Sequence, residues 1–180
     1  MATLHGSELH QPHVTVENYL HSSYEPDCDY VDGRIEERNV GLFNHSVIIT
    51  AIMVAMHRRR DEWNAQVLPS LRLRVSPTRV RVSDLCLVNC NAPHEQVPTH
   101  PPILVIEVLD EQDRFGTTME KLADYERFGV EYIWLVDPER REAFRYRLGG
   151  LERVQTGELA VQRTLIRVDL GEVFAELDRW

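Results

Sequence analysis

Three side chains in the middle of the chain have types and positions suited to phosphoester chemistry: Asp84, Glu107 and Lys121. Two carboxylates on neighbouring strands can hold a hard divalent cation, Mg²⁺ or Mn²⁺, through oxygen ligands. Such a cation lowers the pKa of a bound water and neutralises charge on a phosphodiester, and a lysine beside it stabilises the charge that develops. The three residues therefore indicate metal-assisted hydrolysis, with Asp84 and Glu107 as metal ligands and Lys121 as a further catalytic group.

Glu107 lies inside the apolar run 103–109, which is typical of a buried strand. Because side chains alternate between the two faces of a strand, Glu107 shares its face with Ile103, Val105 and Leu109. A carboxylate in that position is costly without a partner such as a cation. This favours a functional role, and the alternative is a strand-end glutamate paired with an arginine.

Asp84 precedes a second apolar run and shares its face with Cys86 and Val88. Aspartate is also common where strands begin, so a role in a turn is an open alternative. If the two runs form adjacent strands of one sheet, Asp84 and Glu107 come within reach of a single metal ion.

Lys121 is the only lysine in a chain with 19 arginines. Arginine is forked and always charged, whereas lysine is a compact point charge whose pKa can fall on burial. At about 100° per residue, a helix places Lys121 among Leu122, Tyr125 and Phe128, on the side that faces the sheet. A lysine that only extends its stem along apolar surface is the alternative.

The remaining pattern predicts one α/β domain with a central mixed β-sheet flanked by helices. The expected helices cover residues 15–21, 44–63 with Asn44 as cap, the segment around Lys121 that ends at Gly129, and 172–177. The expected strands are a hairpin over 29–38 that turns at Asp32-Gly33, then 66–75, 79–88, 103–109, 132–136, 143–148 and short strands after Gly150, with a loop over 89–102.

Two more side chains in this pattern are candidates for the site. Glu37 can point from the second strand of the hairpin toward the sheet, although an exposed strand glutamate is an equal alternative. His45, in the first turn of its helix, can contact a phosphate or a metal-bound water, and an ordinary capping or core histidine is the alternative.

At 180 residues with 43% hydrophobic residues, the chain is long enough to bury one sizeable core. Residues 1–13 carry His5, His10 and His13 without periodicity and suggest a flexible N-terminal arm before a domain at 14–180. The spacing of these histidines suits no common metal motif.

The pattern of apolar residues contains neither a membrane span nor a signal peptide, so no membrane partner is expected. Three cysteines, Cys28, Cys86 and Cys90, are an odd number without metal-finger spacing. They indicate reduced thiols in a cytoplasmic protein.

The net charge of −9 and pI near 5.4 argue against a broad electrostatic grip on nucleic acid. Local basic stretches exist at residues 58–60 and in the alternating arginines Arg72, Arg74, Arg79 and Arg81. A solvated face is the alternative interpretation of these arginines.

Several short motifs occur together along the chain. They are Val80-Arg81-Val82-Ser83-Asp84, Glu107-Val108-Leu109, Asp113-Arg114, Glu120-Lys121, Tyr125, Phe128-Gly129-Val130 and Trp134-Leu135-Val136-Asp137-Pro138, with Asp32-Gly33, Glu37-Arg38-Asn39-Val40-Gly41 and His45 upstream. This set resembles the Uma-two family of predicted endonucleases, which belongs to the PD-(D/E)XK nuclease superfamily, and the resemblance covers roughly residues 14 to 170.

The resemblance implies a restriction-endonuclease-like fold and a metal-dependent endonuclease that hydrolyses phosphodiester bonds of DNA. Asp84 and Glu107 match the two metal-binding acids, Lys121 matches the family's lysine on the following helix, and Glu37 matches a further acidic position of the site. His45 and Asp113 are accessory candidates.

The chain departs from the family pattern at two places. Ser83 stands where the family usually has proline, and residues 110–112 replace a Ser-Pro-acid run. In the wider superfamily pattern, a lysine usually follows two residues after the glutamate, and this position is Leu109 here. The added acids Asp110 and Glu111 can alter the affinity for metal or phosphate near the site.

Two other function classes remain open at this point. One is a nuclease-fold binding or scaffold protein without activity, which the acidic pI favours, and the other is a metallohydrolase of small phosphoesters. A symmetric homodimer is a further hypothesis, because duplex cleavage requires two cuts and a two-fold pair is the commonest arrangement.

Overall fold

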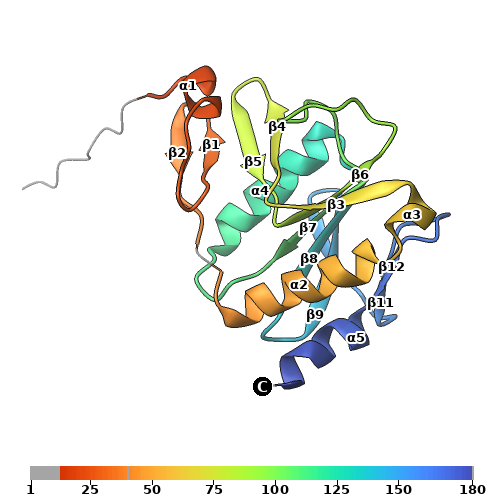
Figure 1. Ribbon diagram of the computed structural model, residues 1–180. Coiled ribbons are helices and arrows are strands. Elements are labelled where there is room, and N and C mark those ends of the chain that lie inside the picture. Colours follow the sequence, from red (N-terminus) through yellow and green to blue (C-terminus); the bar gives the residue numbers. More distant parts are fainter. Residues whose placement is uncertain (1–12, 40, 180) are drawn as a thin grey trace, which may run out of the picture.

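The computed structural model describes residues 13–39 and 41–179 and is built around a six-stranded sheet, most of whose strands are labelled in Figure 1. The strand order is β10-β9-β8-β7-β6-β3, and only β7 and β8 are parallel. The sheet is therefore mixed, as the sequence predicts. Its strands are β3 (Ala65–Pro69), β6 (Leu85–Asn89), β7 (Leu104–Val108), β8 (Tyr132–Asp137), β9 (Glu142–Arg147) and β10 (Gly150–Arg153).

The parallel pair is joined by helix α4 (Phe115–Phe128), which crosses over one face of the sheet. Parallel strands need such a crossover and are usually covered on both faces. All five residues of β7 are buried, in agreement with its apolar sequence. Gly129 ends α4 in the left-handed conformation, with φ 101°, as the sequence predicts.

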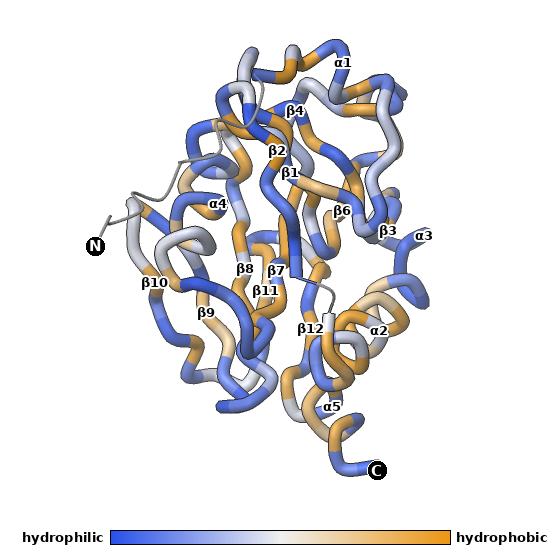
Figure 2. The backbone as a smooth tube through the Cα atoms, turned by 90° about the vertical axis from the view of Figure 1, so that its left-hand side faces the viewer, coloured by the Kyte–Doolittle hydropathy of each residue, from blue (hydrophilic) through white to orange (hydrophobic). Residues whose placement is uncertain are grey.

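Helices cover both faces of the sheet (Figure 2). The helices α2 (Phe43–His57) and α5 (Leu170–Ala175) pack on one face, and α4 packs on the other. Each face of the sheet has its own hydrophobic core, the first under α2 and α5 and the second under α4. Because side chains alternate along β7, Leu104 and Ile106 belong to the first core and Val105 belongs to the second. Glu107 follows Val105 on the face that α4 covers.

A second sheet, in the order β2-β1-β5-β4, lies beside the first and carries the N-terminal part of the chain. The hairpin predicted to turn at Asp32-Gly33 is present, and a small core joins the hairpin to α1. The remaining elements are α1 (Val16–Leu20), β1 (Asp29–Val31), β2 (Arg34–Glu36), α3 (Arg60–Trp63), β4 (Arg72–Ser76), β5 (Arg79–Val82), β11 (Glu158–Ala160), β12 (Arg167–Asp169) and the 3₁₀ helix η1 (Glu176–Arg179).

The prediction of two continuous strands over 66–75 and 79–88 is wrong, because each is divided between the two sheets. β3 and β6 pair in the large sheet, whereas β4 and β5 pair in the small one. Between them the ribbon bends, and the hydrogen bonds from Ser70 N to Asp84 O and from Ser83 N to Leu71 O continue the pairing. The polar residues Ser70, Ser83 and Asp84 interrupt the apolar pattern at the bend, but they do not show that the chain changes sheet there.

The predicted helix from Asn44 to Trp63 also needs correction. The cap residue is Leu42, which has no side chain able to cap, and α2 ends at His57 before the separate turn α3. The backbone N–H of Leu42 donates to the Asp110 carboxylate at 2.8 Å, and the Asn44 amide donates to Glu139. A carboxylate from a distant loop thus replaces the local cap that the sequence predicts.

The C-terminal helix begins earlier than the predicted residue 172, since α5 starts at Leu170 with Asp169 as its cap. The three cysteines are unpaired, with Cys90 exposed. No helix among the described residues has the length and apolar composition needed to cross a bilayer. Most of the arm predicted for residues 1–13 lies outside the described residues.

Candidate active site

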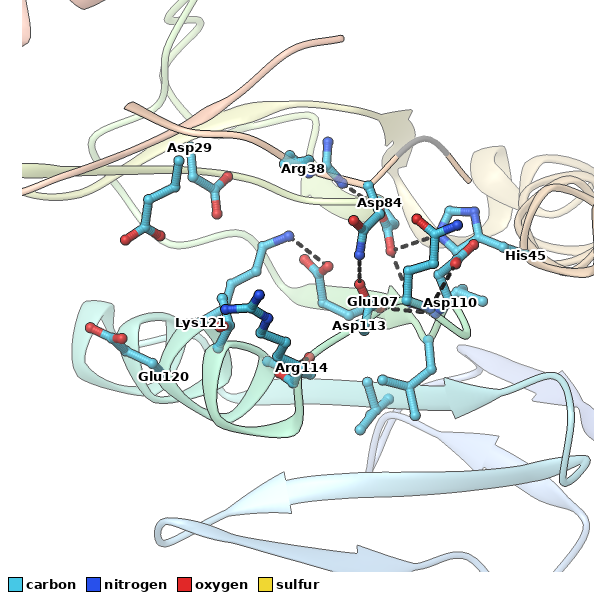
Figure 3. A pocket seen from close by; sticks show the side chains of 18 of the residues that line it. Asp29, Arg38, His45, Asp84, Glu107, Asp110, Asp113, Arg114, Glu120 and Lys121 are labelled. Atoms are coloured by element: carbon cyan, nitrogen blue, oxygen red, sulfur yellow. Dashed lines mark hydrogen bonds and ion pairs between the residues drawn. The ribbon is translucent and has the colours of Figure 1, made fainter. Parts of the chain in front are cut away.

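A pocket of about 460 Å³ opens at the end of β7 where the two sheets and α4 meet (Figure 3). The bend between β5 and β6 forms its floor, and the segment after β2, the start of α2 and the loop before α4 form its walls. Acidic side chains predominate in its lining. They are Asp29, Glu36, Glu37, Asp84, Glu107, Asp110, Asp113 and Glu120, and the basic ones are Arg38, His45, Arg114 and Lys121.

Asp84 lies at the bend, directly before β6, and its side chain is buried. Its Oδ2 accepts the backbone N–H of Val108 at 2.9 Å and lies 3.4 Å from His45 Nε2, while its Oδ1 accepts from Arg38. Burial alone would raise the pKa of this carboxyl, but the hydrogen bond with His45 and the charges of Lys121 and Arg38 outweigh it and hold the pKa well below its usual range. Asp84 is therefore ionised at neutral pH.

Glu107 lies in β7 and is 6% exposed. Its Oε2 accepts from Lys121 Nζ at 2.7 Å, and its Oε1 accepts from the Tyr125 hydroxyl at 2.8 Å. Burial raises the pKa of Glu107 to about 7; the charge of Lys121 opposes this, and that of Asp84 adds to it. The cation partner of this buried carboxylate is thus the lysine and not an arginine.

Asp84 and Glu107 face the same pocket, Asp84 from the bend directly before β6 and Glu107 from the neighbouring strand β7. In the antiparallel pairing of β6 with β7, Leu85 is opposite Ile106, so the next two residues outward are Asp84 and Glu107. Residues opposite each other in antiparallel strands point to the same side of the sheet. Figure 3 shows both carboxylates directed into the pocket.

Lys121 reaches this pair from α4. It is 9% exposed, and Leu122 and Tyr125 beside it are fully buried, so this side of the helix faces the sheet. Because its ammonium donates to Glu107 inside the pocket, Lys121 does not extend to solvent as a snorkelling lysine would.

The other three predicted residues also line the pocket. Glu37 is exposed and directly follows β2. Asp113 accepts the backbone N–H of Asp110 and the side-chain amide of Asn39, so it holds two wall segments together. His45 lies beside Asp84, and its role and that of the other two stay predictions.

His45 is held close to the chain that precedes its helix. A Cβ atom on Gly41 would lie 2.2 Å from Nδ1 of His45, so the ring takes the space that any other residue at position 41 would fill. Burial opposes protonation of His45, but the hydrogen bond and charge of Asp84 outweigh it and raise the pKa above its usual value. A charged His45 adds to the positive groups around Asp84.

Two residues in the site were not predicted from the sequence as functional. Tyr125 was expected as a neighbour of Lys121 on the helix and as part of the family motif set, without a role of its own, and its position four residues after Lys121 on the same helical face was the available signal. Arg38 lies in the motif Glu37-Arg38-Asn39-Val40-Gly41 that contributes to the family resemblance, but the sequence assigned it no role in the site. Its contact with Asp84 joins residues 46 positions apart.

A second cluster of charges supports the wall of the pocket. Arg81 is fully buried; its Nε donates to Asp124 at 2.7 Å, and its Nη1 donates to Asp29 and Glu36, each at 3.1 Å. These bonds connect β5 to α4 and to the N-terminal hairpin. Arg72, Arg79 and Arg81 are thus engaged in internal ion pairs and do not form a free basic face.

The acids of the pocket fit a hydrated divalent cation. Within the part of the chain that the structure describes, no three His, Cys, Asp or Glu side chains form a ready-made metal cage. Mg²⁺, however, commonly uses one or two carboxylates and retains several waters. Asp84 and Glu107 are two hard oxygen donors in one pocket, and they could hold such an ion.

The chain thus combines a mixed sheet with helices on both faces and a pocket at one end of the sheet that contains two acids and a lysine. A family model described as "Uma2: Putative restriction endonuclease" matches residues 16–174, and the chain belongs to this family. The predicted family and fold are therefore confirmed.

Among solved structures, the chain is similar to "a putative nuclease belonging to DUF820" from Anabaena variabilis. The TM-score is 0.77 at 18% identity, over 91% of this chain and 99% of the other, which shows a common fold. A match to DrdV in a DrdV–DNA complex has a TM-score of 0.35 and 14% identity, over 73% of this chain and 13% of that one, and is too weak to bear on function. No curated protein matches the chain.

Proposed function

We propose that this protein is a divalent-metal-dependent endonuclease that hydrolyses phosphodiester bonds of DNA. The observation that carries the proposal is the meeting of Asp84, Glu107 and Lys121 in one pocket, from three separate elements. Membership of a family whose description is "Putative restriction endonuclease" supports the choice of substrate.

In this proposal Asp84 and Glu107 hold Mg²⁺ or Mn²⁺, which when bound supplies a nucleophilic water at neutral pH and neutralises charge on the phosphate. Val108 and Tyr125 orient the two carboxylates through their hydrogen bonds. Lys121 Nζ lies 2.7 Å from Glu107 Oε2. At this position its ammonium can orient the nucleophile or stabilise charge on the scissile phosphate.

Several acids in the wall of the pocket have arginine partners within the protein. Asp29 and Glu36 pair with Arg81, and Glu120 pairs with Arg79 at 2.8 Å. These ion pairs reduce the repulsion of a phosphate by the acids near the site, while the net charge of −9 is unchanged.

The test is cleavage of supercoiled and single-stranded DNA with Mg²⁺ and with Mn²⁺. Asp84→Asn and Glu107→Gln should each abolish cleavage, whereas Glu152→Gln, an exposed glutamate on β10, should leave it unchanged. Activity on a chromogenic phosphodiester without DNA binding would instead support a small-phosphoester hydrolase. Failure to bind either metal would support an inactive scaffold.

A homodimer and a role for Glu37 remain parts of the same proposal. Light scattering at micromolar concentration tests the dimer, and a purely monomeric protein would contradict it. Glu37→Gln tests the residue, with reduced cleavage at an unchanged melting temperature as the expected result.

A further inference from the structure

The two oxygens of Asp84 have different kinds of partner. Oδ2 accepts the backbone N–H of Val108 at 2.9 Å and is close to His45. Oδ1 accepts from the guanidinium of Arg38. A backbone N–H in a buried strand cannot leave its place, but a long arginine side chain that is 21% exposed can rotate away.

Glu107 shows the same division. Oε1 accepts from the Tyr125 hydroxyl, whose ring is fully buried, and Oε2 accepts from the ammonium of Lys121. Each acid therefore has one oxygen held by a fixed donor and the other oxygen held by a cationic side chain. The oxygens held by the two cationic side chains are therefore those that a metal ion could take without breaking a hydrogen bond from a fixed donor.

The entry of a divalent cation would change the charge balance around the two acids. Arg38 and Lys121 together carry two positive charges and compensate two carboxylates in the protein alone. A divalent cation bound to the same carboxylates would leave both side chains without their partners. An anion would then be needed beside them, and a guanidinium binds phosphate oxygens with two parallel N–H groups.

We propose that Arg38 is a phosphate-binding residue of this site: it neutralises Asp84 in the metal-free protein and turns to the substrate phosphodiester once a divalent cation binds Asp84. Metal and phosphate then bind cooperatively, because each makes the site more favourable for the other. The inference rests on the proposed function in taking Asp84 as a metal ligand and a phosphodiester as the substrate.

The first measurement is calorimetric titration of Mn²⁺ into the protein without DNA. Arg38→Met should bind Mn²⁺ more tightly than wild type, on the order of tenfold, since the competing hydrogen bond to Oδ1 is gone. The matched control is Arg114→Met, which removes the same charge from the wall of the same pocket but from an exposed residue. It should change the affinity less than about threefold, because exposed charges are screened.

The second measurement is the affinity of a non-hydrolysable methylenephosphonate dinucleotide, which keeps both non-bridging oxygens, with and without Mg²⁺. Mg²⁺ should raise this affinity in wild type, and Arg38→Met should reduce that gain on the order of tenfold. Arg38→Lys keeps the charge and stays informative if the methionine variant does not fold. The Arg38→Lys variant should bind Mn²⁺ about as tightly as wild type. It should lose part of the increase in dinucleotide affinity that Mg²⁺ causes, since an ammonium lacks the two parallel N–H donors of a guanidinium.

Unchanged or weaker Mn²⁺ binding by Arg38→Met, or an undiminished gain with Mg²⁺ in both Arg38 variants, would overturn the proposal. If wild-type protein cleaves DNA and Arg38→Met cleaves it equally well, the role proposed for Arg38 is overturned and the nuclease function stands. Protein that shows both binding effects but no cleavage would contradict the nuclease function and leave the role of Arg38 standing.

Discussion

The Tyr125 hydroxyl donates to Oε1 of Glu107 at 2.8 Å, on the oxygen that Lys121 does not hold. Tyr125 follows Lys121 by four residues on α4, so one face of one helix supplies both donors. The two bonds keep the buried carboxylate of Glu107 in a single orientation toward the pocket.

Replacing Tyr125 by phenylalanine should therefore lower the free energy of unfolding by about 1 to 3 kcal/mol, the usual cost of leaving a buried charged acceptor without its donor. Cleavage should fall as well, because the carboxylate loses its orientation. Tyr146→Phe is the matched control, since Tyr146 lies in the same core and its hydroxyl makes no hydrogen bond to the described residues. Equal stability losses in urea denaturation of the two variants would rule out this role.

Stability without metal should depend on pH through Glu107. Its pKa is about 7 in the folded protein and 4.5 as an ordinary side chain, so between these values the folded state binds more protons than the unfolded chain. The free energy of unfolding should then fall as the pH rises from 4.5 to 7. Glu107→Gln should flatten this fall, measured by urea titration across that range.

His45 has the same effect on stability, because its pKa is also raised in the folded protein. Its contribution to the free energy of unfolding is lost as the pH rises through this raised pKa. The informative quantity is therefore the difference between wild type and Glu107→Gln at each pH. A difference that stays constant across the range would show that Glu107 does not titrate there.

Lys121→Arg keeps the charge but replaces a compact ammonium by a wide planar group in a buried position. We expect a loss of cleavage on the order of a hundredfold or more, with the melting temperature and metal affinity near those of wild type. Cleavage rate, thermal melting and metal titration, set beside Glu107→Gln, provide the comparison. Normal cleavage by the arginine variant would remove Lys121 from the mechanism, and unfolding of both variants would make the trio structural.

Arg81→Met should destabilise the protein by about 3 to 5 kcal/mol, because it leaves the buried carboxylates of Asp29 and Asp124 without their shared cation. Arg79→Met also removes an arginine from Asp124, but Arg79 is partly exposed and its other partners are solvated. Arg79→Met should therefore lower the free energy of unfolding by about 1 kcal/mol or less. Urea midpoints that do not separate the two variants would contradict the structural role of Arg81.

Local patterns in the sequence were enough for much of the fold and for the choice of the candidate site residues. A glutamate within an apolar strand, and one lysine on the sheet-facing side of a helix, stand out because strand alternation and helical periodicity involve residues close in sequence. The turns at Asp32-Gly33 and Gly129 have the same local origin, since both require a positive φ.

Only the tertiary structure decided the partners of those residues. Arg38 reaches Asp84 across 46 positions, and Asp110 caps α2 across 68, so neither contact leaves a mark on its neighbours in sequence. The bend between β5 and β6 that directs Asp84 into the pocket arises because one ribbon serves two sheets. Periodicity records which face of an element is buried, whereas the choice of partner depends on how distant segments pack together.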